Sequence, residues 1–281
     1  MSLAGFLLFS ALLFRARAHY NFAHLIVNNT VTKPYEYVRM VTNHTFTIPD
    51  GGLPAKPGAP YGNQIPWEEL ERLMRPWPQY SADVLTANHR CGRDAWRPSL
   101  STGIADVIAG ESVGFQVESY VALMQQYDNI THIGPGLAYL AKKPDGIDLA
   151  QWDGDGDWMK IDYKGPDTDD TWSLFGQKQY NFTIPRSTPP GQYLLRVEHI
   201  NPSPKSETEF YVNCAQVNIL GPGGGTPPKS FARFPGTYKV DEPALSLPDG
   251  EQIVDSKARN GVRWLHGFLA YVPPGPTVWT G

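Results

Sequence analysis

Short apolar segments of strand length, separated by clusters of proline and glycine, constrain the fold of this chain most strongly. In one segment polar and apolar residues alternate, so that Phe210, Val212 and Cys214 fall on one face of a strand. Helical periodicity is nearly absent, and only residues 67–74 predict a short helix. The segments that predict strands are residues 35–41, 112–117, 137–141, 179–184, 192–200 and 209–219. This pattern predicts an all-β fold, an antiparallel β-sandwich with long loops and few short helices.

Two connections are longer than a compact β-sandwich needs: residues 45–89 and residues 221–281. The chain contains 27 glycines and 26 prolines, which suit turns and loops rather than long helices. Both connections are rich in aromatic residues, and this content argues against plain disorder. We therefore expect one domain without internal repeats, with its candidate site positions on loops at one edge of the sandwich.

The first residues have the composition of a secretory signal peptide. Residues 3–14 form an almost unbroken apolar run, shorter than the roughly 20 residues that span a bilayer. Ala16 and Ala18 then provide the small-residue spacing of a signal-peptidase site. Cleavage after Ala18 predicts a signal peptide at 1–18 and one secreted, extracellular domain at 19–281 that begins with His19. A membrane anchor or a buried helix is the alternative interpretation of the apolar run.

Charge and composition exclude several classes of partner. The chain has 24 Lys and Arg against 28 Asp and Glu, a net charge of −4 and no basic run, so we expect no nucleic-acid partner. No segment after the leader is apolar enough to predict a membrane span. The two cysteines of an exported chain predict one disulfide bond. Four sequons for N-glycosylation suit a secreted protein, and they lie at Asn28, Asn43, Asn129 and Asn181.

An amino-terminal histidine has a distinct metal chemistry. The free α-amine, with a pKa of about 7.7–8.0, yields its proton easily to a metal and closes a chelate ring with the Nδ1 atom of His19. A third nitrogen from another histidine completes a planar set, which favours Cu(II). His132 is the leading candidate because it lies in a turn before an apolar strand segment. On these residues alone, an incidental cleavage position and an ordinary loop histidine stay open as alternatives. Five further histidines remain candidates for the third nitrogen: His24, His44, His89, His199 and His266.

A series of ordered sequence blocks resembles one known protein family. The blocks include His19-Tyr20-Asn21-Phe22, Tyr37-Val38-Arg39-Met40, His132-x-Gly134-Pro135, Ala138-Tyr139-Leu140-Ala141-Lys142, Gly191-Gln192-Tyr193-Leu194-Leu195-Arg196-Val197-Glu198, Phe210-Tyr211-Val212-Asn213-Cys214-Ala215-Gln216 and Phe234-Pro235-Gly236-Thr237-Tyr238. They run through nearly the whole mature chain. In these blocks the chain resembles the fungal lytic polysaccharide monooxygenases of auxiliary activity family 9, formerly glycoside hydrolase family 61.

The resemblance implies an immunoglobulin-like or fibronectin-like β-sandwich that holds one copper ion in a histidine brace. His19 would supply its amine and one ring nitrogen, His132 the second ring nitrogen, and Tyr211 the axial position. Cys91 and Cys214 match the disulfide of the family. Strand parity agrees with these roles, because Tyr211 and Cys214 are three residues apart and therefore face opposite sides of their strand.

The resemblance also implies the reaction and its partners. The protein would be a secreted, monomeric enzyme that cleaves β-1,4-glucan, most obviously cellulose, by oxidation at C1 or C4. It would cycle copper between Cu(II) and Cu(I) with an external reductant or electron-transfer protein, and use O2 or H2O2 as co-substrate. Tyr271 and Tyr20 are the candidate contacts to the sugar chain. For each, an aromatic residue that only packs within the fold is the alternative.

Two positions depart from the family pattern beside the expected oxygen-binding position. Glu209 stands where the family usually has a glutamine, and Ser203 stands where it usually has a histidine. A carboxylate accepts hydrogen bonds but does not donate them, whereas the usual pair donates. Glu209, Tyr211 and Ser203 are therefore the candidate catalytic residues. A copper-binding protein of the same fold without monooxygenase activity is the first alternative, and a non-catalytic carbohydrate-binding module is the second.

Overall fold

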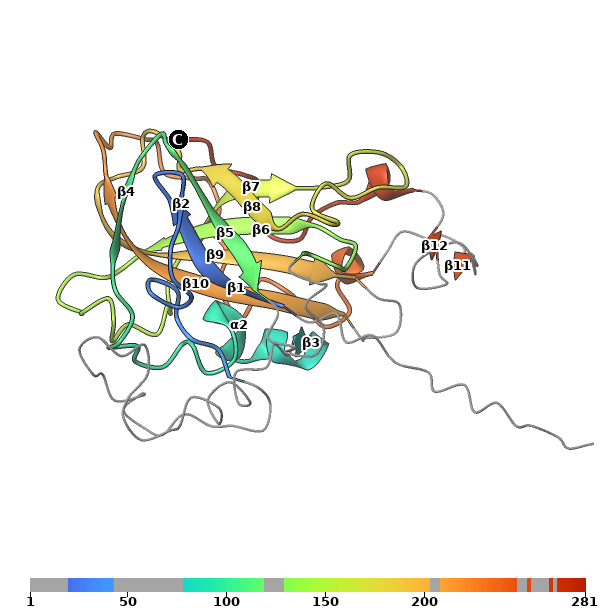
Figure 1. Ribbon diagram of the computed structural model, residues 1–281, viewed down its shortest axis with the longest axis horizontal. Helices are drawn as coiled ribbons and strands as arrows, with labels where there is room; N and C mark the ends of the chain where they lie inside the picture. The colour runs from blue at the N-terminus through green and yellow to red at the C-terminus, as the bar shows by residue number, and fades with distance from the viewer. Residues whose placement is uncertain are drawn as a thin grey trace, which may run out of the picture.

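Two β-sheets pack face to face in the computed structural model, which describes residues 20–42, 78–118, 129–202, 208–246, 252–253, 263–264 and 267–281. One sheet has the strand order β2-β1-β5-β8, and the larger has the order β3-β10-β9-β6-β7, with β4 paired to β10. The strands are β1 (Asn21–Val27), β2 (Thr30–Val31), β3 (Gln79–Tyr80), β4 (Ala105–Ile108), β5 (Ser112–Glu118), β6 (Gly136–Lys142), β7 (Met159–Lys164), β8 (Gln179–Thr183), β9 (Gly191–Asn201) and β10 (Glu209–Leu220). All of these pairings are antiparallel except β4 with β10 (Figure 1). The predicted β-sandwich is confirmed.

Most predicted strands are present. The segments 112–117, 137–141, 179–184, 192–200 and 209–219 form β5, β6, β8, β9 and β10. The strand predicted at residues 35–41 is wrong: Tyr35 has a φ of 55°, which breaks the extended backbone, and only Val38 forms a bridge, to Ala215. The helix predicted at residues 67–74 lies outside the residues that the structure describes.

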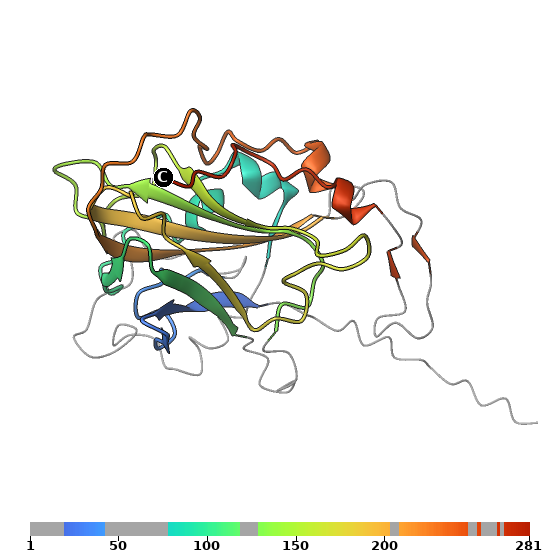
Figure 2. The ribbon, with the colours of Figure 1, turned by 90° about the horizontal axis from the view of Figure 1, so that it is seen from above.

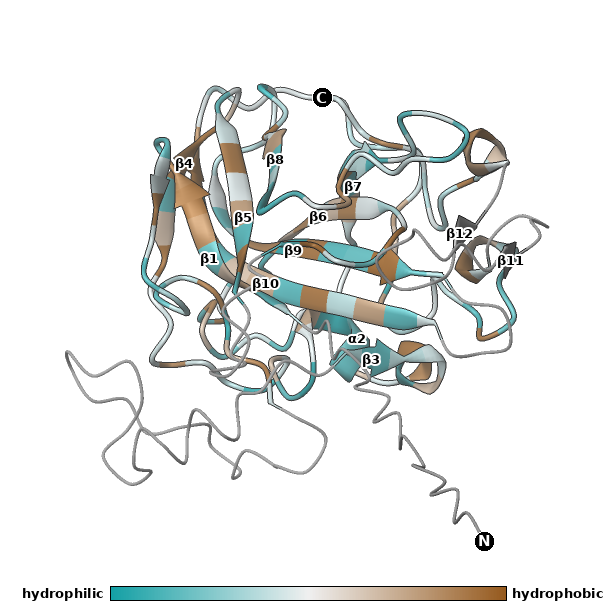
Figure 3. Ribbon diagram, turned by 45° about the vertical axis from the view of Figure 1, so that its right-hand side comes forward, coloured by the Kyte–Doolittle hydropathy of each residue, from teal (hydrophilic) through white to brown (hydrophobic). Residues whose placement is uncertain are grey.

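The larger sheet is covered on both faces. Its inner face packs against the smaller sheet through a core that includes Phe22, Phe115 and Val197. Its outer face carries a second apolar cluster, around Trp158 and Phe234, under the segments that follow β10 (Figure 2). Most residues of β9 and β10 are therefore buried on both faces, polar ones included, and polar and apolar bands follow one another along both strands (Figure 3).

The disulfide bond joins helix α2 (Asn88–Cys91) to strand β10 within the outer apolar cluster. Cys91 ends this short helix, and Cys214 lies in the middle of β10, with a Cα–Cα distance of 4.9 Å. Tyr211 belongs to the inner core and Cys214 to the outer one, as the parity of the strand predicts.

Short elements complete the sandwich at one end. They are the 3-10 helices η1 (Ser81–Leu85), η2 (Pro243–Leu245) and η3 (Phe268–Ala270), and the hairpin strands β11 (Gln252–Ile253) and β12 (Arg263–Trp264). Within the described ranges no helix has the length and apolar character needed to cross a membrane.

Candidate copper site

Four segments that are far apart in the sequence meet at one end of the sandwich, on the right in Figure 1. They are the start of β1, the loop before β6, the end of β9 and the start of β10. The register of β9 and β10 places Asn201 directly opposite Glu209, and His199 directly opposite Tyr211. Side chains of directly paired residues lie on the same face, so all four point toward the start of β1. We call the resulting group the edge cluster, and its members are Tyr20, His132, His199, Asn201, Glu209 and Tyr211.

Aromatic rings form the inner part of the edge cluster. The Tyr20 and Tyr211 rings stack with their centroids 4.2 Å apart, and the His132 ring stacks on Tyr211 at 5.6 Å. The Tyr20 hydroxyl lies 2.7 Å from Nδ1 of His199, which is fully buried. Because stacked and hydrogen-bonded rings leave little rotational freedom, this packing fixes both the start of β1 and the His132 ring.

Hydrogen bonds to one carboxylate oxygen form the outer part of the edge cluster. The Tyr211 hydroxyl donates to Oε2 of Glu209 at 2.9 Å, and the Asn201 amide donates to the same atom at 3.1 Å. Nε2 of His132 is 3.4 Å from this oxygen, and Nδ1 of His132 is 3.3 Å from Nδ2 of Asn201. The His132 and Glu209 side chains keep 24% and 17% of their exposure, although the Nε2 atom of His132 is itself buried.

Burial controls the protonation of the inner residues. Burial, and then the charge of Glu209, raise the pKa of the Tyr20 and Tyr211 phenols well above their usual range. Burial lowers the pKa of His199 to about 3, and the neighbouring His132 acts in the same direction. Two neutral phenols and a neutral imidazole therefore stand beside the more exposed His132 and Glu209 at neutral pH.

The structure brings together four of the predicted site residues: Tyr20, His132, Glu209 and Tyr211. His19 and Ser203 lie outside the described residues. Among those described, no three His, Cys, Asp or Glu side chains are grouped closely enough to hold a metal ion by themselves. The role of His19 as a metal ligand stays a prediction.

Tyr271 lies in a separate aromatic group. Its ring is 8% exposed and packs at 5.2 Å against Trp172, and its hydroxyl donates to the Ala244 carbonyl at 2.6 Å. Ile133, the neighbour of His132, packs against this group, which connects it to the edge cluster. The sugar contact expected of Tyr271 stays a prediction, and in the structure as it stands its ring is covered.

Sequence reasoning did not find two members of the edge cluster. The sequence predicts His199 only as one of several possible metal ligands and assigns no role to Asn201. No local pattern marks either residue, because their partners Tyr20 and His132 are 179 and 69 positions away in the chain. The other described histidines lie elsewhere: His24 pairs with Glu118, and His89 with Glu198. His44 and His266 fall outside the described residues.

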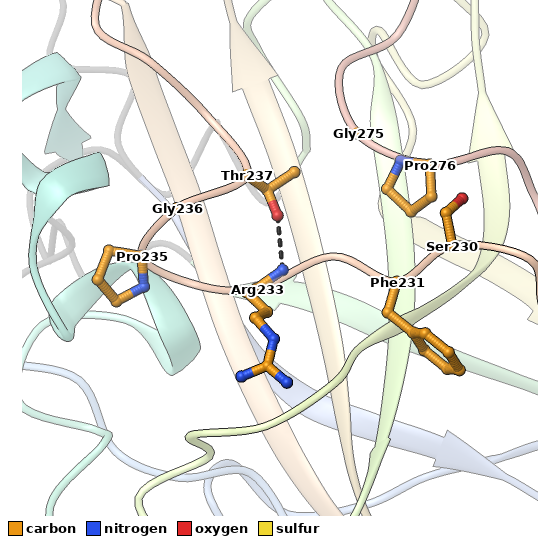
Figure 4. A pocket seen from close by; sticks show the side chains of 8 residues that line it. All are labelled: Ser230, Phe231, Arg233, Pro235, Gly236, Thr237, Gly275 and Pro276. Carbon is orange, nitrogen blue, oxygen red and sulfur yellow. Dashed lines mark hydrogen bonds between the residues drawn. The ribbon is translucent and has the colours of Figure 1, made fainter.

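A shallow pocket of about 490 Å³ lies away from the edge cluster, beside the segments 230–237 and 275–276. Phe231, Arg233 and Thr237 line it (Figure 4). The Arg233 guanidinium already pairs with Asp157 at 2.7 Å. The pocket therefore offers no group of side chains poised for catalysis, and we do not place the function there.

Comparison with known proteins decides the family. The profile of the family described as Auxiliary Activity family 9 (formerly GH61) matches residues 19–255. The chain belongs to auxiliary activity family 9. It is thus a lytic polysaccharide monooxygenase, and its family consists of secreted copper oxidoreductases that act on polysaccharide surfaces.

Individual relatives agree with the membership in auxiliary activity family 9. The chain is 41% identical over 268 residues to AA9 family lytic polysaccharide monooxygenase U of Thermothielavioides terrestris, and the match covers 95% of this chain and 94% of that protein. The solved structure of HiLPMO9B is 22% identical in sequence and has a TM-score of 0.60. The match covers 94% of this chain and 100% of the HiLPMO9B chain. A cellulose-active polysaccharide monooxygenase from M. thermophila gives a TM-score of 0.59 at 21% identity, with coverages of 94% and 100%. At these identities the two structures show a shared fold.

The donor atoms of this family member fit the copper of its family. The Tyr211 hydroxyl and Nε2 of His132 lie 2.9 Å and 3.4 Å from the same carboxylate oxygen of Glu209. Nitrogen and oxygen donors of this kind suit Cu(II). The residues that supply these donor atoms are His132, Tyr211 and Glu209.

Proposed function

We propose that this protein is a secreted enzyme whose mature chain begins at His19 and holds one copper ion with His19 and His132. Residues 1–18 are its signal peptide, and residues 19–281 form one domain. Its substrate is β-1,4-glucan, with cellulose first, which it cleaves by oxidation at C1, C4 or both. The start of the family match at residue 19 supports this boundary.

One observation carries the proposal: Tyr20 stacks on Tyr211 and lies 6.3 Å, ring to ring, from His132. Consecutive Cα atoms are about 3.8 Å apart, so the residue before Tyr20 is tied to this position by a single peptide unit. This short tether supports the proposal that the free amine of His19 binds the same copper ion as the His132 ring.

The chain's own residues have distinct tasks at this site. His19 and His132 bind the copper, which supplies the one-electron and oxygen chemistry. Asn201 and the stacked Tyr211 ring hold His132 in one orientation. Tyr211 stays a neutral phenol because of its raised pKa, and its proton is directed to Glu209. Tyr20, locked by His199, fixes the first residue of the brace.

The substrate proposal rests on the family and on the position of the site. The edge cluster lies at an end of the sandwich, where His132 and Glu209 keep part of their exposure rather than lining a deep pocket. An open position of this kind suits a surface-bound polymer better than a small molecule. The cellulose-active relative from M. thermophila supports cellulose as the first substrate to test.

The test is product analysis with copper-loaded mature protein, cellulose and a reductant, with O2 or H2O2 supplied. We expect oxidised oligosaccharides, and their chemistry assigns C1 or C4. The His132→Ala variant and a variant with one alanine before His19 serve as matched controls, because each removes one part of the brace. Release of the same products by either control would contradict the proposed ligands.

Glu209 favours one alternative, a copper-binding protein that does not oxidise polysaccharide. Its Oε2 atom accepts two hydrogen bonds, so this position does not offer the donor that a glutamine would. This alternative predicts tight copper binding that depends on His19 and His132, without oxidised products. The same experiment therefore separates the two functions.

A further inference from the structure

Glu209 and Asn201 form a directly paired, hydrogen-bonded couple across β9 and β10, beside His132. We infer that Glu209 is an anionic oxygen donor to the copper, held in place by Asn201, and that it stabilises Cu(II) relative to Cu(I). The inference rests on the proposed function, since it presumes copper at His132. It assigns Glu209 as a metal ligand and Asn201 as a positioning residue.

The distances place the carboxylate where a ligand must be. Oε2 of Glu209 is 3.4 Å from Nε2 of His132. Metal–nitrogen and metal–oxygen bonds to a first-row divalent ion are about 2.0–2.2 Å long, so donors at this separation would be close enough to bind the same ion. The carboxylate is thus a ready second donor beside His132.

Asn201 fixes this carboxylate across the sheet. It pairs directly with Glu209 in the β9–β10 register, and its amide donates to Oε2 at 3.1 Å. The same amide nitrogen is 3.3 Å from Nδ1 of His132, so one side chain contacts both donors. Tyr211 adds the second hydrogen bond to Oε2. Two donors on one oxygen restrict the rotamers of Glu209 and aim it at the His132 ring.

The charge of Glu209 determines the direction of the effect. Carboxylate oxygen is a hard donor, whereas Cu(I) prefers soft ligands, so an added carboxylate favours Cu(II). A glutamine of the same shape lacks the negative charge. Replacing Glu209 by Gln should therefore weaken Cu(II) binding more than Cu(I) binding.

The experiment measures both affinities and the Cu(II) electron paramagnetic resonance spectrum of the mature protein. For Glu209→Gln we expect the ratio of Cu(II) to Cu(I) affinity to fall at least tenfold, which raises the midpoint potential by about 59 mV. The spectrum should change with it, because an oxygen donor is lost or altered. Asn201→Ala, which keeps the carboxylate but removes its support, should lower the ratio about threefold. Glu209→Asp, which keeps the charge, should stay closer to the wild type than Glu209→Gln.

Glu118→Gln is the matched control. Glu118 is another partly exposed carboxylate paired with a histidine, His24, but on β5 of the smaller sheet. It should leave both affinities and the spectrum unchanged. Circular dichroism of each metal-free variant checks that the fold is retained.

The possible outcomes distinguish a failure of the inference about Glu209 from a failure of the proposed copper site. If the wild type binds copper through His132 while Glu209→Gln has the wild-type spectrum and affinity ratio, the inference about Glu209 is overturned and the copper proposal stands. If Asn201→Ala behaves as the wild type while Glu209→Gln shows the expected change, the positioning role is overturned alone. If the wild type binds no copper, the proposed function itself fails.

Discussion

Two polar clusters lie on opposite faces of the larger sheet, and they use the same kinds of residues. The edge cluster lies on the inner face at the strand ends. The second group, which we call the ion cluster, lies on the outer face nearer the middle of β9 and consists of His89, Tyr139, Arg196, Glu198 and Tyr238. Each cluster combines histidine, glutamate and tyrosine.

The clusters differ in burial and in how their glutamate is paired. Glu198 is fully buried and bound by the Arg196 guanidinium at 2.8 Å and by the Tyr238 hydroxyl at 2.6 Å. Glu209 accepts hydrogen bonds from the neutral Tyr211 hydroxyl and Asn201 amide, and its side chain keeps 17% of its exposure. A closed ion pair of the first kind holds the fold together, whereas a carboxylate at an accessible edge can exchange a partner for a ligand. Residue type alone does not separate the two.

The largest effect should come from breaking the ion cluster. Replacing Glu198 by Gln leaves the buried Arg196 charge without its counter-ion, and we expect the free energy of unfolding to fall by about 3–5 kcal/mol. The same change at Glu209 in the metal-free protein should cost less than about 1 kcal/mol, because that site is partly solvated. Urea denaturation measures both. Equal losses would erase the distinction between the clusters.

Copper affinity, unlike the free energy of unfolding, should depend on the edge cluster and not on the ion cluster. We expect His132→Ala to weaken Cu(II) binding at least a hundredfold, or about 2.7 kcal/mol, because one ligand of the brace is lost. His89→Ala should leave Cu(II) affinity unchanged although it destabilises the fold, since His89 is buried in the ion cluster. Isothermal titration calorimetry on folded protein distinguishes them. A comparable loss in His89→Ala would contradict the assignment.

Acid should destabilise both clusters through their buried histidines. Burial lowers the pKa of His89 and of His199 to about 3, below the unfolded value near 6.5. Between these values the unfolded chain binds more protons, so stability is complete above pH 6.5 and falls as the pH decreases, by up to about 1.4 kcal/mol per pH unit for each histidine. Urea unfolding of the metal-free protein at pH 7 and pH 5 tests this. His199→Gln should flatten the dependence, and an unchanged slope would count against a neutral buried His199.

A surface pair on the smaller sheet should show the smallest effect, with the opposite sign. Burial alone would lower the pKa of His24, but the hydrogen bond and charge of Glu118, together with the Thr32 carbonyl, raise it. Its contribution is therefore fully present below about pH 6.5 and is lost as the pH rises through the folded pKa. The stability difference between wild type and Glu118→Gln should be below about 1 kcal/mol and larger at pH 5.5 than at pH 8.5. A difference that grows with pH would refute this sign.

Part of the fold follows from local sequence patterns. Alternation of polar and apolar residues located β10, and three-residue spacing correctly placed Tyr211 and Cys214 on opposite faces. β1 was not predicted, because nearly all of its residues are buried and its sequence does not alternate. The strand expected at 35–41 failed because the positive φ of Tyr35 has no composition signal. Local conformation of this kind is imposed by distant packing.

By itself, the sequence determined the class of fold, the family and the residue types of a copper site, because periodicity and motif spacing are local properties of the chain. Only the tertiary structure decided that His199 and Asn201 belong to that site, since Tyr20 and His199 are 179 positions apart, and His132 and Asn201 are 69 apart. It also decided that two glutamates of similar sequence setting differ in role. Glu198 faces a closed core and Glu209 an accessible edge, because strand parity and register send them to different faces and different ends of the sheet.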